Sequence, residues 1–381
     1  MQKTIKLYDN NAYMKEFSAV VLDCREKNGV YNIVLDQTAF FPEEGGQTAD
    51  TGFIGDVAVI GANEIDGVIY HICEGPLMTG ATYKCKINFE ERFDKMQNHT
   101  GEHIVSGITN KLYGYDNIGF HLSDNVVTLD FNGMLTREQL NEIELLANKA
   151  VFENRPVTAY YPDSTELQNL NYRSKLELSE NVRIVNIENY DSCACCAPHV
   201  ARTGEVGLIK LLDTEKNKGG IRIYMKCGNR ALLDYQQKYK NIYEISKSLC
   251  AKQNETANAV EQLLKEKDSL NYKIGGLNRL LIDNELSRLT QTQKNLLYFY
   301  DALDTDTMRY FANGAVEFCN IFAIFTKKEN GYAYICASKA TDMREFAKQL
   351  NLTLNGRGGG NDKMIQGTLF AERSDIEAFF N

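Results

Sequence analysis

Two short stretches, His99-Thr-Gly-Glu-His103 and Cys195-Cys-Ala-Pro-His199, organise the prediction of this fold. Two histidines four residues apart on a helix lie on the same face, so both imidazoles can reach one ion. A cysteine and a histidine separated by three residues in a loop can complete a tetrahedron, and imidazole with thiolate favours zinc. Each pair alone could equally be packed or solvent-facing. Together, they predict one zinc site with ligands His99, His103, Cys195 and His199.

Upstream of the first stretch, residues 1 to about 88 favour β-structure. Short runs that alternate apolar and polar residues, such as 18–22 and 31–35, are separated by turn signals. We expect a small β-barrel over residues 1–88. Gly45 and Gly46 suit a tight turn that brings the backbone close to a ligand, although an ordinary hairpin loop would also explain them.

From residue 89 the hydrophobic period becomes helical. A helix is predicted over 89–112, with both histidines of the first stretch on it and Gly114 placed to end it. A capping box at Thr136 and Gln139 begins a second helix. Strands are expected at 118–122, 126–131, 182–187, 208–212 and 221–225, which makes residues 89–233 an α+β domain. Cys193 and Cys196 lie close enough to Cys195 to replace it as the ligand.

Residues 234–290 have a different character. Apolar residues recur there at alternating spacings of three and four, as in a helical or coiled-coil linker. An amphipathic helix folded onto its own domain and an intermolecular seam both fit this pattern. Gly275 and Gly276 should loosen the helix near its end.

The last stretch, 291–381, alternates predicted strands and helices and is expected to form an α/β domain. It contains Gly356-Arg-Gly-Gly-Gly360, which lacks the Gly-Lys-Ser/Thr ending of a P-loop. Consecutive glycines expose backbone N–H groups to a phosphate or to another backbone. The predicted fold class is therefore α+β and multidomain.

Composition limits the classes of function. A formal net charge of −9 argues against a generic nucleic-acid coat, although local basic patches could still bind RNA. Seven of the ten cysteines are scattered singly, which fits a reduced cytosol better than a disulfide framework. No signal peptide or long apolar run is present, so we expect a cytoplasmic protein with no membrane partner.

These motifs resemble those of the AlaX family in its long form, the free-standing relatives of the alanyl-tRNA synthetase editing domain. The matching segments are Gly45-Gly-Gln-Thr-Ala-Asp50-Thr-Gly52, the two zinc stretches, Thr203-Gly-Glu-Val-Gly207 and the run from Arg222 to Ala231. The glycine-rich motif near the C-terminus resembles one shared by alanyl-tRNA synthetase and DHH-type phosphoesterases. Two departures occur: the usual Cys-Gly-Gly-Thr-His is here Cys-Cys-Ala-Pro-His, and the usual His-Thr-Ala-Gln-His is His-Thr-Gly-Glu-His.

The resemblance implies a zinc-containing deacylase that hydrolyses the ester between a wrong amino acid, serine and possibly glycine, and alanine tRNA. It also implies a homodimer formed through residues 235–289, the C-terminal domain, or both. The candidate catalytic residues are Gln47, Thr38 and Glu102. The candidate substrate- or tRNA-binding residues are Gly45, Gly46, Asp50, Arg222, Gly358, Gly359 and Gly360.

Three points of this hypothesis stay open. A site that hydrogen-bonds the seryl hydroxyl discriminates strongly, and Thr38 has the right side chain, although it could be an ordinary strand threonine. Glu102 adjoins a ligand, but neighbouring helical positions face about 100° apart. Four protein ligands normally close a zinc site, so zinc could organise the pocket without activating water.

Two other classes of function remain. One is a tRNA-binding module whose zinc is purely structural. The other is a zinc hydrolase acting on another ester, or a DHH-type phosphoesterase. The absence of an Asp-His-His triplet from the sequence disfavours the phosphoesterase.

Overall fold

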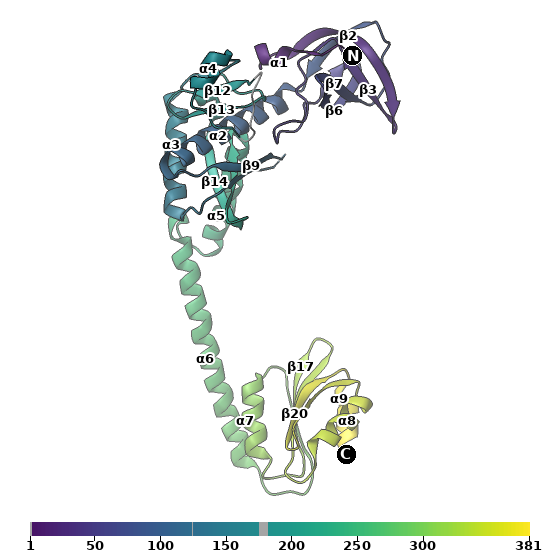
Figure 1. Ribbon diagram of the computed structural model, residues 1–381. Coiled ribbons are helices and arrows are strands. Elements are labelled where there is room, and N and C mark those ends of the chain that lie inside the picture. The colour runs from purple at the N-terminus through teal and green to yellow at the C-terminus, as the bar shows by residue number, and fades with distance from the viewer. Residues whose placement is uncertain (1, 124, 175–181) are drawn as a thin grey trace. The chain divides into compact units, whose positions relative to one another are not determined.

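The computed structural model describes residues 2–123, 125–174 and 182–381, and it shows an α+β protein of several sheets and helices (Figure 1). This confirms the expected α+β, multidomain class. The chain divides into two compact units, Met1–Asn241 and Ile242–Asn381. Among the helices described, none has both the length and the apolar character needed to cross a membrane.

The first part of unit one is a closed six-stranded barrel whose neighbouring strands are all antiparallel. Its interior is filled by inward-facing apolar residues such as Val21, Ile33 and Ile54. A short helix, α1 (Leu7–Asn10), precedes the barrel. In barrel order, the strands are β2 (Glu16–Lys27), β3 (Val30–Leu35), β7 (Val68–Cys73), β6 (Val57–Ile65), β5 (Gly52–Ile54) and β8 (Thr82–Ile87).

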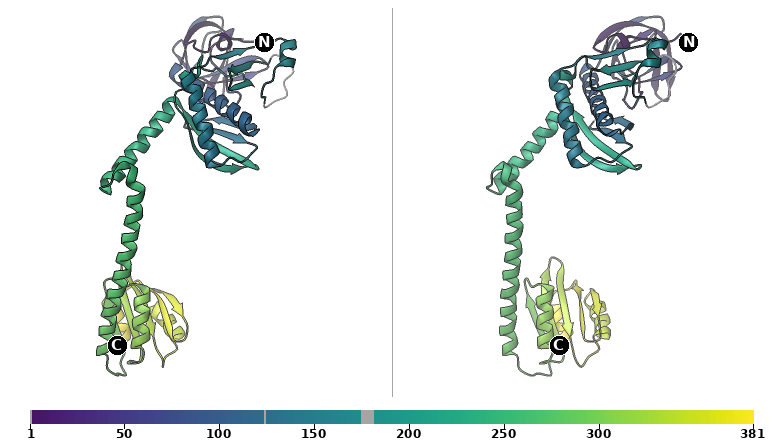
Figure 2. Two further views of the ribbon diagram at one scale, coloured as in Figure 1. Left: turned by 90° about the vertical axis from the view of Figure 1, so that its left-hand side faces the viewer. Right: turned by 60° about the vertical axis from the view of Figure 1, so that its left-hand side comes forward.

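The second part packs two helices, α2 (Phe89–Tyr113) and α3 (Arg137–Glu153), against an antiparallel sheet (Figures 1 and 2). Gly114 ends α2 in the left-handed conformation, and Thr136 and Gln139 form the predicted capping box of α3. The sheet order is β14 (Ile209–Asn217), β15 (Gly220–Cys227), β10 (Val127–Phe131) and β9 (Asn117–Leu122).

A smaller antiparallel sheet leads into the loop that contains Cys195. Its central strand pairs with both neighbouring strands, and the Cys195 loop follows directly after the last strand. Arg202 begins a 3₁₀ turn (Thr203–Val206) after that loop. The strands are β11 (Val157–Tyr160), β12 (Ile184–Ile187) and β13 (Asp191–Ala194), with α4 (Ser164–Asn169) between the first two.

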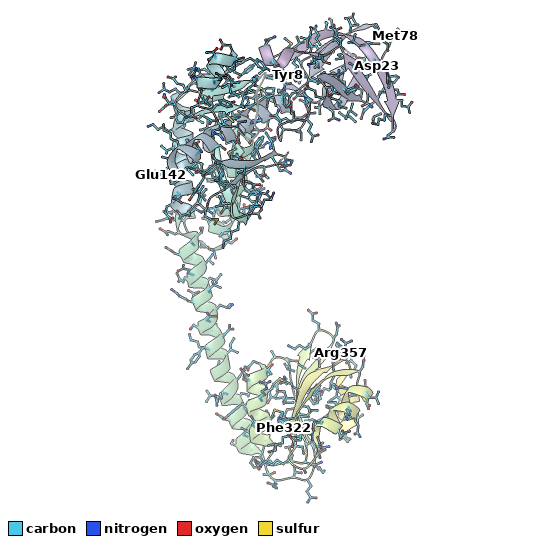
Figure 3. All side chains as sticks on the ribbon, in the orientation of Figure 1. Tyr8, Asp23, Met78, Glu142, Phe322 and Arg357 are labelled. Atoms are coloured by element: carbon cyan, nitrogen blue, oxygen red, sulfur yellow. The ribbon has the colours of Figure 1, made fainter. Side chains whose placement is uncertain are left out.

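Unit two is built on a five-stranded mixed sheet with helices on both faces (Figure 1). Helices α6 (Thr256–Arg288) and α7 (Thr305–Ala315) cover one face, and α8 (Met343–Thr353) and α9 (Arg373–Phe380) cover the other. Phe322 of the central strands is fully buried (Figure 3). The sheet order is β16 (Leu296–Tyr300), β17 (Phe322–Lys328), β18 (Gly331–Ala337), β20 (Met364–Leu369) and β19 (Gly356–Gly360).

The helical stretch predicted over residues 234–290 differs from its prediction in two ways. Instead of one helix, α5 (Gly228–Ser248) ends before α6 begins, and Cys250 between them has a φ of +50°. A left-handed residue interrupts the i→i−4 ladder, which a heptad pattern does not reveal. Conversely, Gly275 and Gly276 do not loosen α6, which continues through them to Arg288.

Candidate metal centre

Four predicted ligands lie together in unit one. Helix α2 supplies His99 and His103, one turn apart, and the loop after β13 supplies Cys195 and His199. Their ligand atoms all lie within 4.8 Å of one another. The Cys195 Sγ atom is 3.5 Å from His99 Nε2 and 3.9 Å from His199 Nε2. These groups are therefore positioned to bind one metal ion.

A second set of contacts orients the three imidazoles. The Nδ1 atom of His99 lies 2.9 Å from Gln47 Oε1, that of His103 lies 2.8 Å from Asp191 Oδ2, and that of His199 lies 2.8 Å from the Ala197 carbonyl. Each Nδ1–H can donate to an oxygen, so each Nε2 is left to accept a metal. Among the residues described, His103 Nε2 is buried with no hydrogen-bond partner.

Electrostatics favours the metal-binding protonation state for Cys195 and His199, but not for His103. Burial alone would raise the pKa of the Cys195 thiol, but the imidazoles of His99 and His199 hold it well below its usual value. Burial lowers the pKa of His199 to about 4, which keeps that ring neutral. Burial also acts to lower the pKa of His103, but Glu102 and Asp191 outweigh it and raise that pKa. Metal ligation requires a thiolate and available imidazole nitrogen.

Two contributors, Asp191 and Arg173, were missed by the sequence analysis. Arg173 donates to Asp191 through Nε (2.7 Å) and Nη2 (2.8 Å), and this fixes the carboxylate that holds His103. The pairing joins an irregular segment to a strand, so no local spacing predicts it. Cys193 forms a second group with His103 and Asp191, whereas Cys195 shares its group with all three histidines.

The turn that contains Gly45 and Gly46, called the glycine turn below, places Gln47 beside the candidate ligands. Gln47 is fully buried, and its Nε2 has no hydrogen-bond partner among the described residues. Gly46 has a φ of +83°, and a Cβ there would lie 2.4 Å from the Phe120 carbonyl oxygen. Only glycine permits this approach to β9, where the Phe120 ring packs 4.5 Å from the His99 ring.

Thr38 is buried on the short strand β4 (Gln37–Thr38), and its hydrogen bonds among the described residues go to His71 and Phe40. Its hydroxyl lies 2.8 Å from His71 Nε2 and accepts a hydrogen bond from the Phe40 N–H at 3.1 Å. His71 Nδ1 lies 3.0 Å from the Ile33 carbonyl, and burial lowers the pKa of His71 to about 4. A neutral His71 that donates from Nδ1 must accept at Nε2, so Thr38 is the donor.

Glu102 lies nearer to the ligands than its helical position suggests. Its Oε1 accepts hydrogen bonds from Ser106 (2.8 Å) and Asn117 (2.7 Å), and its Oε2 is 3.7 Å from His103 Nε2. The side chain is buried. A long flexible side chain therefore offsets the angle of about 100° between adjacent helical positions.

Two other predicted binding residues are held in ion pairs. Asp50 is buried, pairs with Arg92 of α2 and accepts a hydrogen bond from the Phe41 N–H at 2.6 Å. Arg222 of β15 makes two hydrogen bonds to Asp130 on the neighbouring strand, at 2.6 and 2.8 Å. Both side chains are thus engaged within the chain, and their expected binding roles stay predictions.

The remaining predicted residues are glycines in two places. Gly45 lies beside the loop that contains Cys195 and His199, called the metal loop below. A Cβ on Gly45 would be 3.7 Å from Cys196 Sγ. Gly358, Gly359 and Gly360 form part of the edge strand β19 and belong to unit two. Their backbone was expected to be open to a phosphate or to another backbone, and one side of it pairs with the backbone of β20 in antiparallel fashion.

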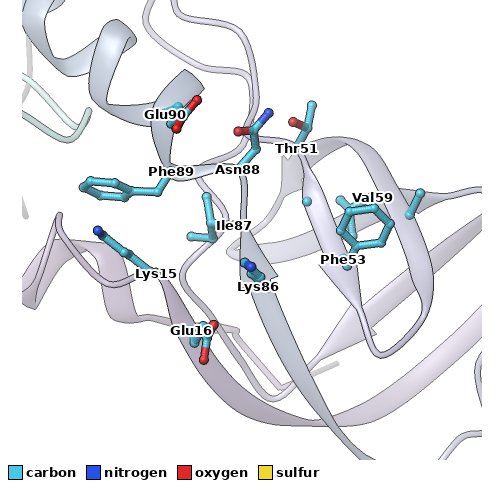
Figure 4. A pocket seen from close by; sticks show the side chains of 12 residues that line it. Lys15, Glu16, Thr51, Phe53, Val59, Lys86, Ile87, Asn88, Phe89 and Glu90 are labelled. Atoms are coloured by element: carbon cyan, nitrogen blue, oxygen red, sulfur yellow. The ribbon is translucent and has the colours of Figure 1, made fainter.

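A separate cavity of about 700 Å³ opens between the barrel and the start of α2 (Figure 4). Lys15 and Lys86 line it, together with the rings of Phe53 and Phe89. Lys15 Nζ lies over the Phe89 ring, 4.5 Å from its centroid, and Phe53 is half exposed. None of the four candidate ligands lines this cavity.

Comparisons with known proteins found one matching family model and several similar proteins. Residues 182–224, which contain the Cys195 loop, match the family described as the threonyl and alanyl tRNA synthetase second additional domain. The alanyl-tRNA editing protein AlaX-L of Pyrococcus horikoshii is 28% identical over 97% of this chain and 96% of its own length.

Two further similarities are partial. The alanine–tRNA ligase of Thermofilum pendens is 32% identical over 97% of this chain, which spans only 42% of the ligase. Among solved structures, the C-Ala domain of Aquifex aeolicus alanyl-tRNA synthetase matches 24% of this chain and 90% of its own length. Its identity of 15% and TM-score of 0.21 are too low to establish a shared fold.

These similarities indicate the class first: residues 182–224 are similar to the second additional domain of threonyl- and alanyl-tRNA synthetases. Within that class, it is a relative of the alanyl-tRNA editing protein AlaX-L along nearly its whole length. The resemblance noted in the sequence is thereby confirmed.

Proposed function

We propose that this chain is a trans-editing hydrolase that removes serine and glycine from mischarged alanine tRNA. The observation that carries the proposal is the group of His99, His103, Cys195 and His199, beside which Gln47 has an Nε2 atom without a hydrogen-bond partner among the described residues. The name of the relative AlaX-L, an alanyl-tRNA editing protein, supports the substrate class.

The donor set and its spacing fit zinc. Zinc–nitrogen bonds of about 2.05 Å and zinc–sulfur bonds of about 2.3 Å in a tetrahedron put the two donors roughly 3.6 Å apart. The separations from Cys195 Sγ, 3.5 and 3.9 Å, match this value, and His103 Nε2 has no other partner among the described residues. Zinc in this site would supply Lewis-acid polarisation of the ester or would hold the pocket together.

Gln47 is positioned to stabilise charge that develops on the ester oxygen. Its Oε1 is engaged by His99 Nδ1, which fixes the direction of the amide. The Nε2 hydrogens are buried and have no acceptor among the described residues. A fixed donor in a buried site acts most strongly where negative charge develops, so Gln47 favours the transition state over the bound ester.

Glu102 is the candidate that orients the attacking water. Ser106 and Asn117 fix one carboxylate oxygen, and the other lies 3.7 Å from His103 Nε2, beside the ligand group. Holding water against the ester carbonyl converts a bimolecular reaction into one within a single complex. Replacement by Gln would keep the shape of Glu102 and remove its charge.

Thr38 is the candidate that distinguishes serine from glycine. Its proton is directed to His71 and one lone pair accepts from Phe40, so one lone pair remains for the seryl hydroxyl. Thr38→Val deletes this acceptor. Leaving a buried hydroxyl unsatisfied costs about 1–3 kcal/mol, roughly five- to 150-fold in rate on seryl-tRNA. The rate on glycyl-tRNA should change little, and equal losses on both esters would exclude this role for Thr38.

Binding of tRNA requires surfaces beyond the metal centre. The cavity of Lys15, Lys86, Phe53 and Phe89 offers cations for phosphates and rings on which bases can stack, although Glu16 also lines it. The exposed glycine strand of unit two offers a second surface. Apolar residues along α6 are exposed, and we propose that they pair with a second copy of this chain.

A deacylation assay on seryl-tRNA of the alanine type tests the function. We expect hydrolysis that stops after chelation and returns with zinc, about one zinc per chain by elemental analysis, and little activity on serine tRNA correctly charged with serine. Tight binding without hydrolysis would favour a tRNA-binding module with structural zinc. Hydrolysis of simple esters alone would favour a zinc hydrolase acting on another substrate.

A further inference from the structure

A group of polar side chains beside the metal centre has no part in the chemistry described above. Tyr8 of α1, labelled in Figure 3, is 2% exposed. Its ring packs edge-on against Phe41 at a centroid distance of 5.4 Å. It belongs to an apolar cluster against which Cys195 and Cys196 pack. Among the described residues, the Tyr8 hydroxyl has no hydrogen-bond partner. A buried hydroxyl without a partner is costly and indicates a ligand.

The residues around this hydroxyl are predominantly acidic. Burial, followed by the nearby carboxylates of Asp9, Glu64 and Glu44 and the thiol of Cys196, raises the pKa of Tyr8 well above its usual value. Surroundings of this kind disfavour an anion and favour a cation.

Two of these carboxylates already have cationic partners. Glu64 pairs with Lys6 at 2.7 Å, and Asp9 lies 3.8 Å from Arg183. In the part of the chain that the structure describes, Glu44 has no ion-pair partner. Glu44 therefore has a charge to offer to a ligand.

The backbone fixes Glu44 next to the site. Glu44 and Gln47 exchange two backbone hydrogen bonds, of 3.2 and 3.0 Å, across the glycine turn. Gly45 within this turn lies against the Cys196 thiol, as described above. On the other side, Arg183 donates to the carbonyls of Cys195 and Ala197 at 3.0 and 2.9 Å. The glycine turn and the metal loop therefore place Glu44 near Cys196, which adjoins the candidate ligand Cys195.

We propose that Tyr8 and Glu44, which both lie near Cys196, bind the α-ammonium group of the aminoacyl ester. An ammonium group donates three hydrogen bonds and carries the positive charge that this subsite lacks. Every aminoacyl ester has this group next to its carbonyl, so its capture would place the carbonyl towards Gln47 and the metal ligands. The inference rests on the proposed deacylase function and adds a contact common to seryl and glycyl esters.

The test compares seryl-tRNA with N-acetylseryl-tRNA, which keeps the ester and the hydroxyl but loses the charge. The parent protein should hydrolyse the acetylated ester at least about tenfold more slowly, as expected for the loss of one charged hydrogen bond. Glu44→Gln and Tyr8→Phe should each lower kcat/KM on seryl-tRNA about tenfold and leave the acetylated ester unchanged.

Matched variants separate this role from a structural one. Glu43→Gln removes the same charge from the neighbouring residue, which is exposed as Glu44 is, and should leave both rates unchanged. Tyr8→Phe keeps the ring that packs on Phe41, and the metal content should stay at the parent level in all variants. A binding contact is identified when a variant keeps its metal and the ratio of its rate on seryl-tRNA to its rate on N-acetylseryl-tRNA falls towards one.

Three outcomes would overturn the proposal. Equal rates of the parent protein on both esters would remove the ammonium subsite and leave the deacylase function intact. Equal losses on both esters in Glu44→Gln and Tyr8→Phe would assign these residues to the shape of the pocket. Hydrolysis of neither ester by the parent protein would overturn the proposed function and this inference together.

Discussion

Helices α2 and α6 have similar shares of polar residues in their sequences but opposite surroundings. Helix α2 buries 15 of its 25 residues, and among them are the polar side chains of Arg92, Lys95, Asn98, His99 and His103. Helix α6 buries only Thr256 and Ile282 of its 33 residues, although many of its apolar side chains are large.

This difference separates two kinds of evidence for function. Buried polar groups are costly unless they are paired; those of α2 either pair within the chain, as Arg92 does with Asp50, or form the candidate metal centre, as His99 and His103 do. Exposed apolar groups at helical spacing indicate a surface that another molecule covers. The exposed apolar residues of α6 are Val260, Leu263, Leu264, Leu270, Tyr272, Ile274, Leu277, Leu280 and Leu281.

The largest expected effect breaks the site on α2. His103→Ala removes one of four candidate ligands and the ring that Asp191 orients. A three-ligand remnant binds metal far less tightly, and metal loss is coupled to loss of folding. We expect little zinc by elemental analysis and no measurable deacylation. A full zinc complement in this variant would exclude His103 from the site.

A second variant tests the buried charge on the same helix. Asp50→Ala leaves the Arg92 guanidinium buried without its carboxylate. Breaking one side of a buried pair costs about 3–5 kcal/mol, which should be visible as reduced unfolding free energy in urea. Asp268→Ala, on the exposed surface of α6, is the matched control and should change little. Equal effects of the two variants would contradict the contrast between the helices.

Asp191→Asn tests the orientation of His103 without removing a ligand. The amide keeps the shape of the carboxylate but loses its charge and its ion pair with Arg173. Partners of this kind typically contribute ten- to 100-fold to metal affinity, about 1.4–2.7 kcal/mol. Competition with a chromogenic chelator would measure this change. Unaltered affinity would limit Asp191 to packing.

Glu91 at the start of α2 provides a test that depends on pH. Burial opposes ionisation of Glu91, but hydrogen bonds from Lys95 and Thr51 outweigh it and lower its pKa below the usual value of 4.5. A lowered pKa in the folded state stabilises it above pH 4.5, and this stability is lost as the pH falls further. Glu91→Gln should therefore destabilise the protein at pH 7, by less than about 1 kcal/mol for this partly exposed group, and much less at pH 3. Urea titrations at the two pH values would measure this difference.

The smallest effect on stability is expected on α6 itself. Leu277→Gln changes a side chain that is 66% exposed, so unfolding free energy should move by no more than about 0.5 kcal/mol. If α6 pairs with a second copy, light scattering should show that the variant has lost self-association. A large loss of stability in a monomeric parent would instead mean that α6 folds back onto its own chain.

The sequence predicted features that depend on short spacings. The i, i+4 histidines, the capping box at Thr136 and the end of α2 at Gly114 all depend on residues within one or two turns. Gln47 could be singled out by its motif, but its contact with His99 spans 52 residues and required the folded barrel. The four ligands lie together as their spacing suggested.

Long-range pairing explains what the sequence did not reveal. Asp50 has the same motif position whether it binds substrate or, as here, neutralises Arg92. Tyr8, Arg173 and Asp191 belong to no local pattern. The replacement of the usual alanine by Gly101 also has a tertiary cause, since a Cβ there would lie 2.3 Å from Cys227 Sγ.

The separation of 96 residues between His99 and Cys195 also has a consequence during synthesis. Ribosomes add roughly 5–20 residues per second, so the α2 histidines emerge about 5–20 s before the first loop ligand. For that interval the nascent chain offers only a helical pair of imidazoles, to which many transition metals bind weakly. The four candidate ligands are complete only after His199 has been translated. Discrimination between metal ions by this set would therefore begin late in the synthesis of unit one.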